Sequence, residues 1–162
     1  MQVKVKEVKV GKLDHIAYKI LYTRRKEKMK MKDLITSIQD NLSDDLLKPT
    51  YKDMSKKHKF YGHCYVASET FYHLTKRLSC MGYPKKGYKV YQNKDSNNIS
   101  HWWLADDEDN IIDITKEQYT DFGVSPPYKN GKRKGFLTKS PSKRSQKLMK
   151  TIMKQHIWCC FI

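Results

Sequence analysis

The sequence predicts a single α+β domain in which a helix that begins with a cysteine packs on a small antiparallel sheet. Three observations favour this fold class. Apolar side chains recur at helical spacing from residue 64 to residue 78, three short strand-like segments follow between residues 87 and 114, and turn-forming residues separate these segments. A chain of 162 residues is long enough for one domain with a substantial core and too short for two ordinary ones.

The composition indicates a packed globule with a strongly basic surface. Hydrophobic residues make up 38% of the chain and include 11 Tyr, 5 Phe and 3 Trp, a content that disordered chains lack. The 33 Lys and Arg outnumber the 17 Asp and Glu, and the formal net charge of +16 favours partners such as nucleic acid, anionic lipid or acidic protein. An excess of Lys over Arg is also typical of AT-rich coding sequences, so the charge by itself identifies neither a partner nor a catalytic role.

The cysteines indicate a reducing compartment. They stand at positions 64, 80, 159 and 160 without a C-x-x-C spacing, and an adjacent pair is poorly placed for two independent disulfides. No apolar run approaches the ~20 residues of a membrane-spanning helix, and the N-terminus lacks the apolar segment of a secretory signal. We therefore expect a cytoplasmic protein, in the host cytoplasm if it is virus-encoded, with no membrane span.

Three regions are expected along the chain. They are an N-terminal strand with a basic extension, an α+β core, and a C-terminal basic helix with a short apolar tail, at residues 1–32, 33–141 and 142–162. Alternation over residues 2–10 predicts the strand, and the basic run at 23–32 is interpreted as a solvated linker or helix surface, with a nucleic-acid contact as the alternative. The tail ends in Cys159-Cys160-Phe161-Ile162, which formally matches a prenylation signal, and we interpret this match as incidental.

Residues 33–47 predict the first helix of the core, because apolar side chains recur there at helical spacing and Asp33 is a good N-cap. Pro49 disfavours helical geometry in the residue before it, so the helix should end near Lys48. The second helix follows Gly62, which permits a tight turn. The apolar face of this helix consists of Cys64, Ala67, Phe71, Leu74 and Leu78.

Three strands should form an antiparallel meander, because polar or acidic turns separate the strand-like segments. The strands are predicted at residues 87–91, 99–105 and 111–114. Trp102 and Trp103 fall on opposite faces of the second strand, so one should lie in the core and the other should form a wall of a cleft. A stacking platform for single-stranded nucleic acid is the alternative use of the exposed one.

The rest of the chain predicts two more helices and a basic loop. Thr115 is a suitable N-cap for a short helical turn at 116–119, with Gln118 at the capping-box position. Residues 129–135 are predicted to form the basic loop. The last helix is expected at 142–156, and its apolar face consists of Leu148, Ile152 and Met153.

Cys64, His101 and Asp113 are the candidate catalytic residues. The N-terminus of a helix and a nearby imidazole both favour the thiolate form of a cysteine, which is the nucleophile. The imidazole then protonates the leaving group, and a carboxylate on its other nitrogen fixes its orientation. A cysteine at a helix start, with a histidine and an aspartate on adjacent strands, can converge at one edge of a sheet, so we predict a Cys-His-Asp triad.

Each of these residues also has a purely structural interpretation. Cys64 could be a small buried residue of the helix face, His101 could hydrogen-bond locally in its strand, and Asp113 could cap the following turn. A zinc site that includes these residues has suitable residue types, but His63-Cys64 is its only closely spaced pair of ligands. We therefore expect neither a metal nor another cofactor.

Four short motifs stand in the order Gly62-His63-Cys64, Ser100-His101-Trp102, Asp113-Ile114-Thr115 and Gln118-Tyr119. On these motifs, residues 60–120 resemble the papain-like and transglutaminase-like thiol fold, and more narrowly the YunG-like small bacterial proteins. The pattern of that family is a Gly-Gln-Cys turn, a Ser-His-aromatic strand, and an Asp-Leu-Thr segment with Gln-Phe soon after it. The later segment Pro126-Pro127-Tyr128 also looks like that of uncharacterised phage-type proteins.

The resemblance implies a papain-like core and a thiol-dependent activity. The family pattern has Gln before the cysteine, where this chain has His63. In papain-like enzymes an upstream Gln helps to form the oxyanion hole, so here that role would pass to the backbone N–H of Cys64 and to His63 or Tyr61. Trp102 is expected to form part of the cleft.

Two functions are consistent with these features. The first is a papain-like thiol protease, or a related hydrolase or transferase, that acts on an amide, isopeptide or thioester bond of a protein or small molecule and is encoded by a phage or mobile element. Cys64 would be its nucleophile, His101 its general base and acid, and Asp113 its orienting residue. The alternative is a non-enzymatic basic module that binds nucleic acid or an acidic host protein with salt-sensitive affinity. Both could coexist, with the basic loop at 129–134 steering an acidic substrate.

Overall fold

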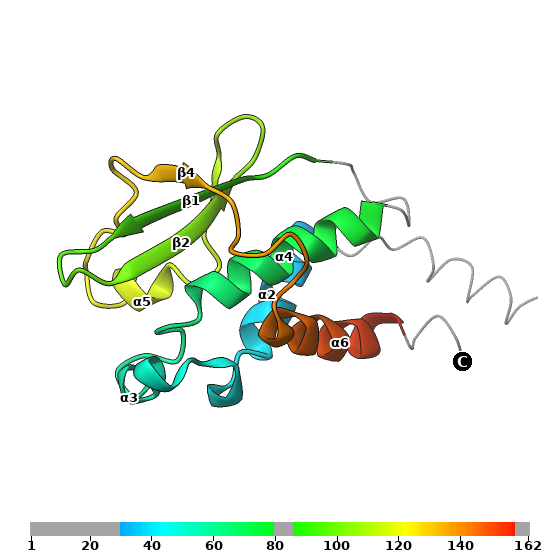
Figure 1. Cartoon of the computed structure of the whole chain (residues 1–162), viewed down its shortest axis with the longest axis horizontal. Helices are drawn as coiled ribbons and strands as arrows, with labels where there is room; N and C mark the ends of the chain where they lie inside the picture. The colour runs from blue at the N-terminus through cyan, green and yellow to red at the C-terminus, as the bar shows by residue number, and fades with distance from the viewer. Residues whose placement is uncertain (1–29, 80–85, 158–162) are drawn as a thin grey trace, which may run out of the picture.

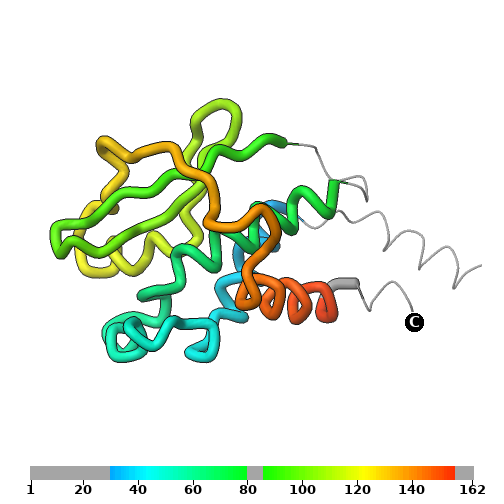
Figure 2. Tube along the Cα trace, viewed as in Figure 1, coloured from blue at the N-terminus to red at the C-terminus, as the bar shows by residue number. Residues whose placement is uncertain are grey.

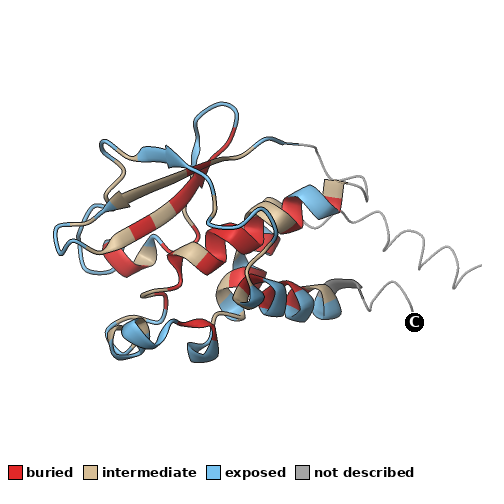
Figure 3. Cartoon of the chain, in the orientation of Figure 1, coloured by how far each residue is buried: buried red, intermediate tan, exposed pale blue. Residues whose placement is uncertain are grey.

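Helix α4 (Cys64–Ser79) runs through the middle of the structure. The computed structural model describes residues 30–79 and 86–157. In it, α4 packs between strand β2 (Ser100–Ala105) on one side and helices α2 (Met31–Asp40) and α6 (Lys143–Ile157) on the other (Figures 1 and 2). Residues 66–71 are all buried, so this part of α4 is covered on every side (Figure 3). The predicted α+β class, with one helix-and-sheet core, is confirmed.

The predicted apolar face of α4 is confirmed. Ala67 and Phe71 are fully buried, and Cys64, Leu74 and Leu78 are nearly so. The core lies between the sheet and the three helices, and its cluster consists of Leu34, Ile38, Leu46, Val66, Ala67, Phe71, Leu74, Leu78, Val90, Leu104, Ile114, Leu148, Met149 and Ile152.

Several predictions fall on residues outside the described ranges. They are the strand at residues 2–10, most of the basic extension, and the C-terminal tail with its two cysteines. Among the helices of the described ranges, none combines the length and the apolar character that crossing a membrane requires.

The sheet has four antiparallel strands in the order β3-β2-β1-β4. Their bounds are Lys89–Lys94 for β1, Ser100–Ala105 for β2, Ile111–Ile112 for β3 and Lys132–Lys134 for β4. The predicted meander of the first three strands is confirmed. The predicted basic loop at 129–135 instead contains β4, whose residues are all exposed and therefore lack the alternation that indicates a strand. Its cationic side chains protect this edge of the sheet from pairing with another chain.

The turn between β2 and β3 fixes the register on which the candidate site depends. Asp106 Oδ1 accepts a hydrogen bond from the backbone N–H of Asn110 at 2.9 Å, which closes the turn. The resulting register pairs Leu104 with Ile112. Asp113 directly follows β3, so it returns beside the earlier residues of β2.

The predicted helix at 33–47 is wrong in its extent. The structure has α2, which ends at Asp40, and then a separate 3-10 helix, η1 (Asp44–Leu46). The side chain of Asn41 donates a hydrogen bond to the backbone oxygen of Ser37 at 2.8 Å. Such side-chain bonds compete with the backbone bonds that would continue a helix, so α2 stops there.

Asp33 also differs from its predicted role as the N-cap. It lies within the first turn of α2, and its carboxylate accepts a hydrogen bond from the backbone N–H of Lys30 at 3.1 Å. Pro49 begins a second 3-10 helix, η2 (Pro49–Tyr51), which runs into the short helix α3 (Lys52–Ser55). These elements lead the chain to the turn before α4.

Helix α6 contributes to the core, although the sequence-based division places it in the C-terminal region. It buries Leu148, Met149 and Ile152 in the core cluster. Its start is anchored on α4, because Ser142 Oγ donates a hydrogen bond to Glu69 Oε2 at 2.5 Å. Glu69 is fully buried, so this bond satisfies a carboxylate that would otherwise be costly to bury.

Candidate active site

Gly62 forms the turn that places Cys64 at the start of α4. Its φ of +78° lies in the left-handed region that favours glycine. A Cβ at this position would lie 2.7 Å from Tyr51 Cβ and 3.0 Å from Leu47 Cδ2. The turn therefore requires glycine both for its backbone conformation and for its close contact with η2.

Replacing Gly62 with alanine should lower the free energy of unfolding by about 2–3 kcal/mol, because left-handed strain and the steric contact add together. Gly123→Ala is the matched control. Gly123 also has a positive φ, +68°, but an added Cβ there meets no described atom within 4 Å. We expect it to cost only about 1 kcal/mol. Urea unfolding curves measure both losses, and equal losses would show that the contact with Tyr51 contributes nothing.

Cys64 lines a pocket of about 200 Å³ at the N-terminus of α4. Its side chain is only slightly exposed, and its thiol donates a hydrogen bond to the backbone oxygen of Ser100 at 3.6 Å. The first backbone N–H groups of a helix have no partner within the helix and carry its positive dipole end. The other residues that line the pocket are Lys48, Tyr51, Gly62, Tyr65, Ile99, Ser100, Trp102, Gln118, Leu137 and Arg144.

His101 is hydrogen-bonded to Asp113 in the interior. His101 Nε2 lies 2.6 Å from Asp113 Oδ2, and the two side chains are 0% and 1% exposed. Two more donors hold the carboxylate. Tyr128 Oη donates to Oδ2 at 2.9 Å, and the backbone N–H of Thr115 donates to Oδ1 at 3.0 Å. A carboxylate fixed in this way also fixes the orientation of the imidazole.

The imidazole of His101 lies between the carboxylate and the thiol. Because Asp113 occupies Nε2, Nδ1 is the ring nitrogen left to interact with Cys64, and Gln118 Nε2 lies 3.4 Å from it. Burial by itself lowers the pKa of His101, but the hydrogen bonds with Asp113 and Cys64 and the charges of both groups outweigh it and raise the pKa to about 9. The structure thus brings the three predicted catalytic residues together.

The three predicted cleft residues are placed differently from one another. Trp102 lines the Cys64 pocket, and its ring packs edge-on against Tyr65 with the ring centroids 5.1 Å apart. Tyr61 lines a neighbouring, larger cleft instead, and burial raises its pKa. His63 lines neither of these two cavities.

His63 is buried on the side of α4 that faces η1 and α6. Its side chain is 1% exposed, and Asp44 and Arg144 are the charged residues that act on it most strongly. Burial lowers the pKa of His63 to about 4, so its ring is neutral at pH 7. Its Nδ1 has no hydrogen-bond partner among the described residues. The described contacts therefore give His63 no role in either cavity.

Gln118 is a site residue that the sequence indicated as a helix cap and as part of the Gln118-Tyr119 motif, without a role in the site. It lies in α5 (Glu117–Thr120), is 4% exposed, and lines both the Cys64 pocket and the larger cleft. Its Nε2 donates to the backbone oxygen and to Oγ1 of Thr115, both at 2.9 Å, and lies 3.4 Å from His101 Nδ1. The sequence signal was the Gln118-Tyr119 motif, whereas Tyr128 had no local signal for its contact with Asp113.

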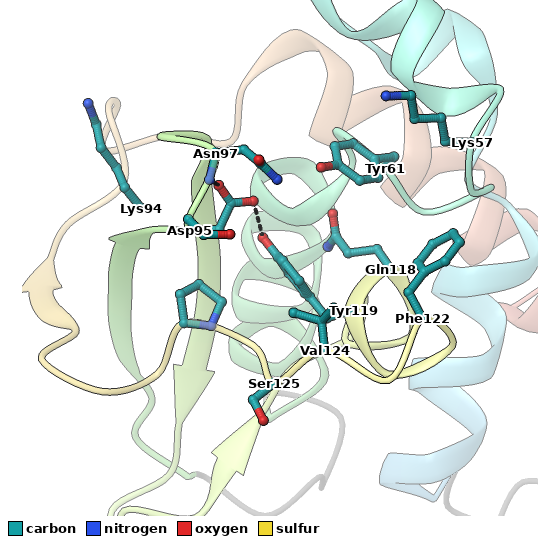
Figure 4. A pocket seen from close by; sticks show the side chains of 12 residues that line it. Lys57, Tyr61, Lys94, Asp95, Asn97, Gln118, Tyr119, Phe122, Val124 and Ser125 are labelled. Carbon is teal, nitrogen blue, oxygen red and sulfur yellow. Dashed lines mark hydrogen bonds between the residues drawn. The ribbon is translucent and has the colours of Figure 1, made fainter.

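The larger cleft has a volume of about 880 Å³ and lies next to the candidate catalytic residues. Gln118 is the residue that it shares with the Cys64 pocket. Figure 4 shows Gln118 between Tyr61 and Tyr119, with Lys57 and Lys94 on opposite sides of the cleft. The remaining wall is largely apolar and consists of Phe122, Val124 and Pro127 together with the polar residues Asp95, Ser96, Asn97 and Ser125.

Comparisons of the chain with family models, with curated proteins and with solved structures gave no match. Within the two described ranges, no group of three or more His, Cys, Asp and Glu side chains is arranged to hold a metal ion.

Proposed function

We propose that this protein is a papain-like cysteine hydrolase or transferase that acts on an amide, isopeptide or thioester bond. The observation that supports the proposal is the buried, hydrogen-bonded pair of His101 and Asp113, whose imidazole interacts with Cys64 beside a pocket at a helix N-terminus. A cysteine that is only a small core residue has no need of a buried histidine and aspartate behind it.

The reaction would proceed through an acyl-enzyme. The raised pKa of His101 favours the state in which Nδ1 already holds the thiol proton, and the Sγ thiolate of Cys64 attacks the carbonyl carbon of the substrate. As the tetrahedral intermediate collapses, His101 returns the proton to the leaving nitrogen or sulfur, and a thioester remains on Cys64. A water molecule or an acceptor amine then gives a proton to His101, attacks the thioester, and releases the acyl group as Sγ regains its proton.

Two donors can stabilise the oxyanion of this reaction. One is the backbone N–H of Cys64, at the unpaired start of α4. The other is Gln118 Nε2, which lines the Cys64 pocket. To donate to the oxyanion, Gln118 would exchange one of its two hydrogen bonds with Thr115 for the substrate oxygen. Gln118 would thus replace the upstream Gln of the family pattern, and His63 would not.

The lining of the larger cleft indicates the class of substrate. Its aromatic and aliphatic walls suit an apolar side chain, and Lys57 and Lys94 favour acidic groups at its rim. Since Gln118 separates this cleft from the Cys64 pocket, a polypeptide could lie across both and place a carbonyl at the sulfur. A protein substrate therefore fits better than a small molecule.

Labelling with iodoacetamide tests the nucleophile. In the wild-type protein at pH 7 we expect Cys64 to be the first cysteine modified, as found by mapping the labelled peptides, although it is nearly buried. Cys64→Ala should keep the fold, as seen by circular dichroism, and lose this fast phase. Cys80→Ala is the matched control and should keep it. Fast labelling that persists in Cys64→Ala, or that maps to another cysteine, would contradict the assignment.

A further inference from the structure

A second cavity, remote from the catalytic residues, has a cationic lining. It lies between the C-terminal half of α4 and α6 and has a volume of about 610 Å³. Lys76, Arg77, Lys139 and Lys150 contribute four cationic side chains to it, and none of the described residues that line it is acidic. Lys76 is twelve positions beyond Cys64 on the same helix, which is about 18 Å along the axis. We call this cavity the basic groove.

The cations of the basic groove have no counter-ions in the described part of the chain. The ion pairs of the described residues join other lysines, such as Lys56 to Asp53 and Lys89 to Asp109. Lys76 and Arg77 lie in the last turn of α4, where the helix dipole favours cations. The dipole of α4 does not account for Lys139 and Lys150, which come from a loop and from α6. Unpaired like charges repel one another, and a bound external anion would offset this repulsion.

Helix α6 extends the positive charge beyond the groove. Its sequence contains no acidic residue, and its exposed lysines recur at spacings of four, three and four, which places them on one face. They are Lys143, Lys147, Lys150 and Lys154. The row is about 16 Å long and meets the groove at Lys150. Lys147 alone is paired, with Asp45.

We propose that the basic groove and the lysine row of α6 bind the phosphate backbone of a single-stranded nucleic acid. An evenly charged backbone matches a row of evenly spaced cations. An acidic peptide would also need partners for its backbone, and the groove lies between two helices, where there is no strand edge to pair with. A flexible single strand can enter such a groove, whereas a stiff duplex would lie across its opening without entering it. This function is separate from the proposed catalysis.

The groove also contains features that suit a nucleotide. Met149 and Met153 provide apolar surface between the cations, and Gln146 provides an amide. His73 also lines the groove. Apolar contact and phosphate binding are both available within one cavity.

Fluorescence anisotropy with a labelled oligothymidine of ~12 nucleotides tests the proposal on the full chain. We expect binding that weakens between ~50 and ~200 mM salt. A groove variant with Lys76, Arg77, Lys139 and Lys150 all changed to Gln should bind at least ~10-fold more weakly. The slope of log K against log salt should also fall by up to about 3, since each lost phosphate contact on a single strand removes ~0.7.

The matched control removes the same charge elsewhere. Lys129, Lys132, Arg133 and Lys134 are equally exposed and lie on and before β4, far from α6 in Figure 1. Changing these four to Gln should alter affinity less than ~3-fold, and Cys64→Ala should not alter it at all.

Equal losses in both four-residue variants would overturn the proposal, because net charge alone would then explain binding. Displacement of the oligothymidine by polyglutamate at equal charge would overturn it in favour of an acidic protein. Lys150→Gln alone, with a slope change of about 0.7, serves if the larger variant folds poorly.

Discussion

Replacing His101 with alanine should slow the reaction of Cys64 with iodoacetamide at pH 7 by at least ~100-fold, the usual contribution of a positioned general base. The imidazole is the only titratable side chain that links the thiol to Asp113 in the described structure. Without it, the thiol proton has no acceptor and the sulfur stays a weak nucleophile. The measurement is the rate constant of labelling at Cys64, followed by peptide mapping.

Three variants separate a catalytic role from a loss of folding. His58→Ala removes a histidine that pairs with Asp121 at 3.1 Å and should leave the rate unchanged. Asp113→Asn keeps a polar partner but removes the charge that helps to raise the pKa of His101, so its rate should be intermediate. Tyr128→Phe removes one donor to Asp113 and should have the smallest effect of the site variants. A His101→Ala protein that reacts as fast as the wild type would exclude the triad.

The meeting of the three candidate catalytic residues could be predicted because local patterns fix their positions. The spacing of apolar residues places Cys64 at the start of a helix, and the acidic turn before Ile111 brings Asp113 back beside His101. These signals lie within one helix or one pair of strands. Helix propensity and turn chemistry were therefore sufficient to predict how these elements meet.

Other parts depend on contacts between distant segments. The sequence predicts only one buried face for α4, but residues 66–71 are buried all round because α6 covers the opposite side. Glu69 is buried for the same reason, since its partner Ser142 comes from the far end of the chain. The contact of Tyr128 with Asp113 likewise depends on the packing of the loop after α5. No local pattern encodes such contacts.

The stability of the protein should be greatest near neutral pH and fall on both sides, because two buried histidines titrate in opposite directions. The pKa of His63 is lowered by burial to about 4, compared with ~6.5 in the unfolded chain. As the pH falls from 6.5 towards 4, His63 binds a proton in the unfolded chain but not in the folded protein, so the free energy of unfolding decreases. The pKa of His101 is raised to about 9. Its stabilisation is complete below about 6.5 and is lost as the pH rises through 9.

Differences between variants isolate each histidine from the many carboxylates and lysines that also titrate. His63→Gln should remove the destabilisation that His63 adds as the pH falls, and His101→Gln should remove the stabilisation that is lost towards pH 9. The difference in the free energy of unfolding between the wild type and His63→Gln should therefore change by about 2 kcal/mol between pH 7 and pH 5. The difference between the wild type and His101→Gln should change by about 2 kcal/mol between pH 7 and pH 9. Urea unfolding at pH 5, 7 and 9 gives these differences. Opposite signs for the two variants would support a neutral His63 in the core and a charged His101 in the site. A His101→Gln difference that does not depend on pH would contradict the interaction of a charged His101 with Asp113.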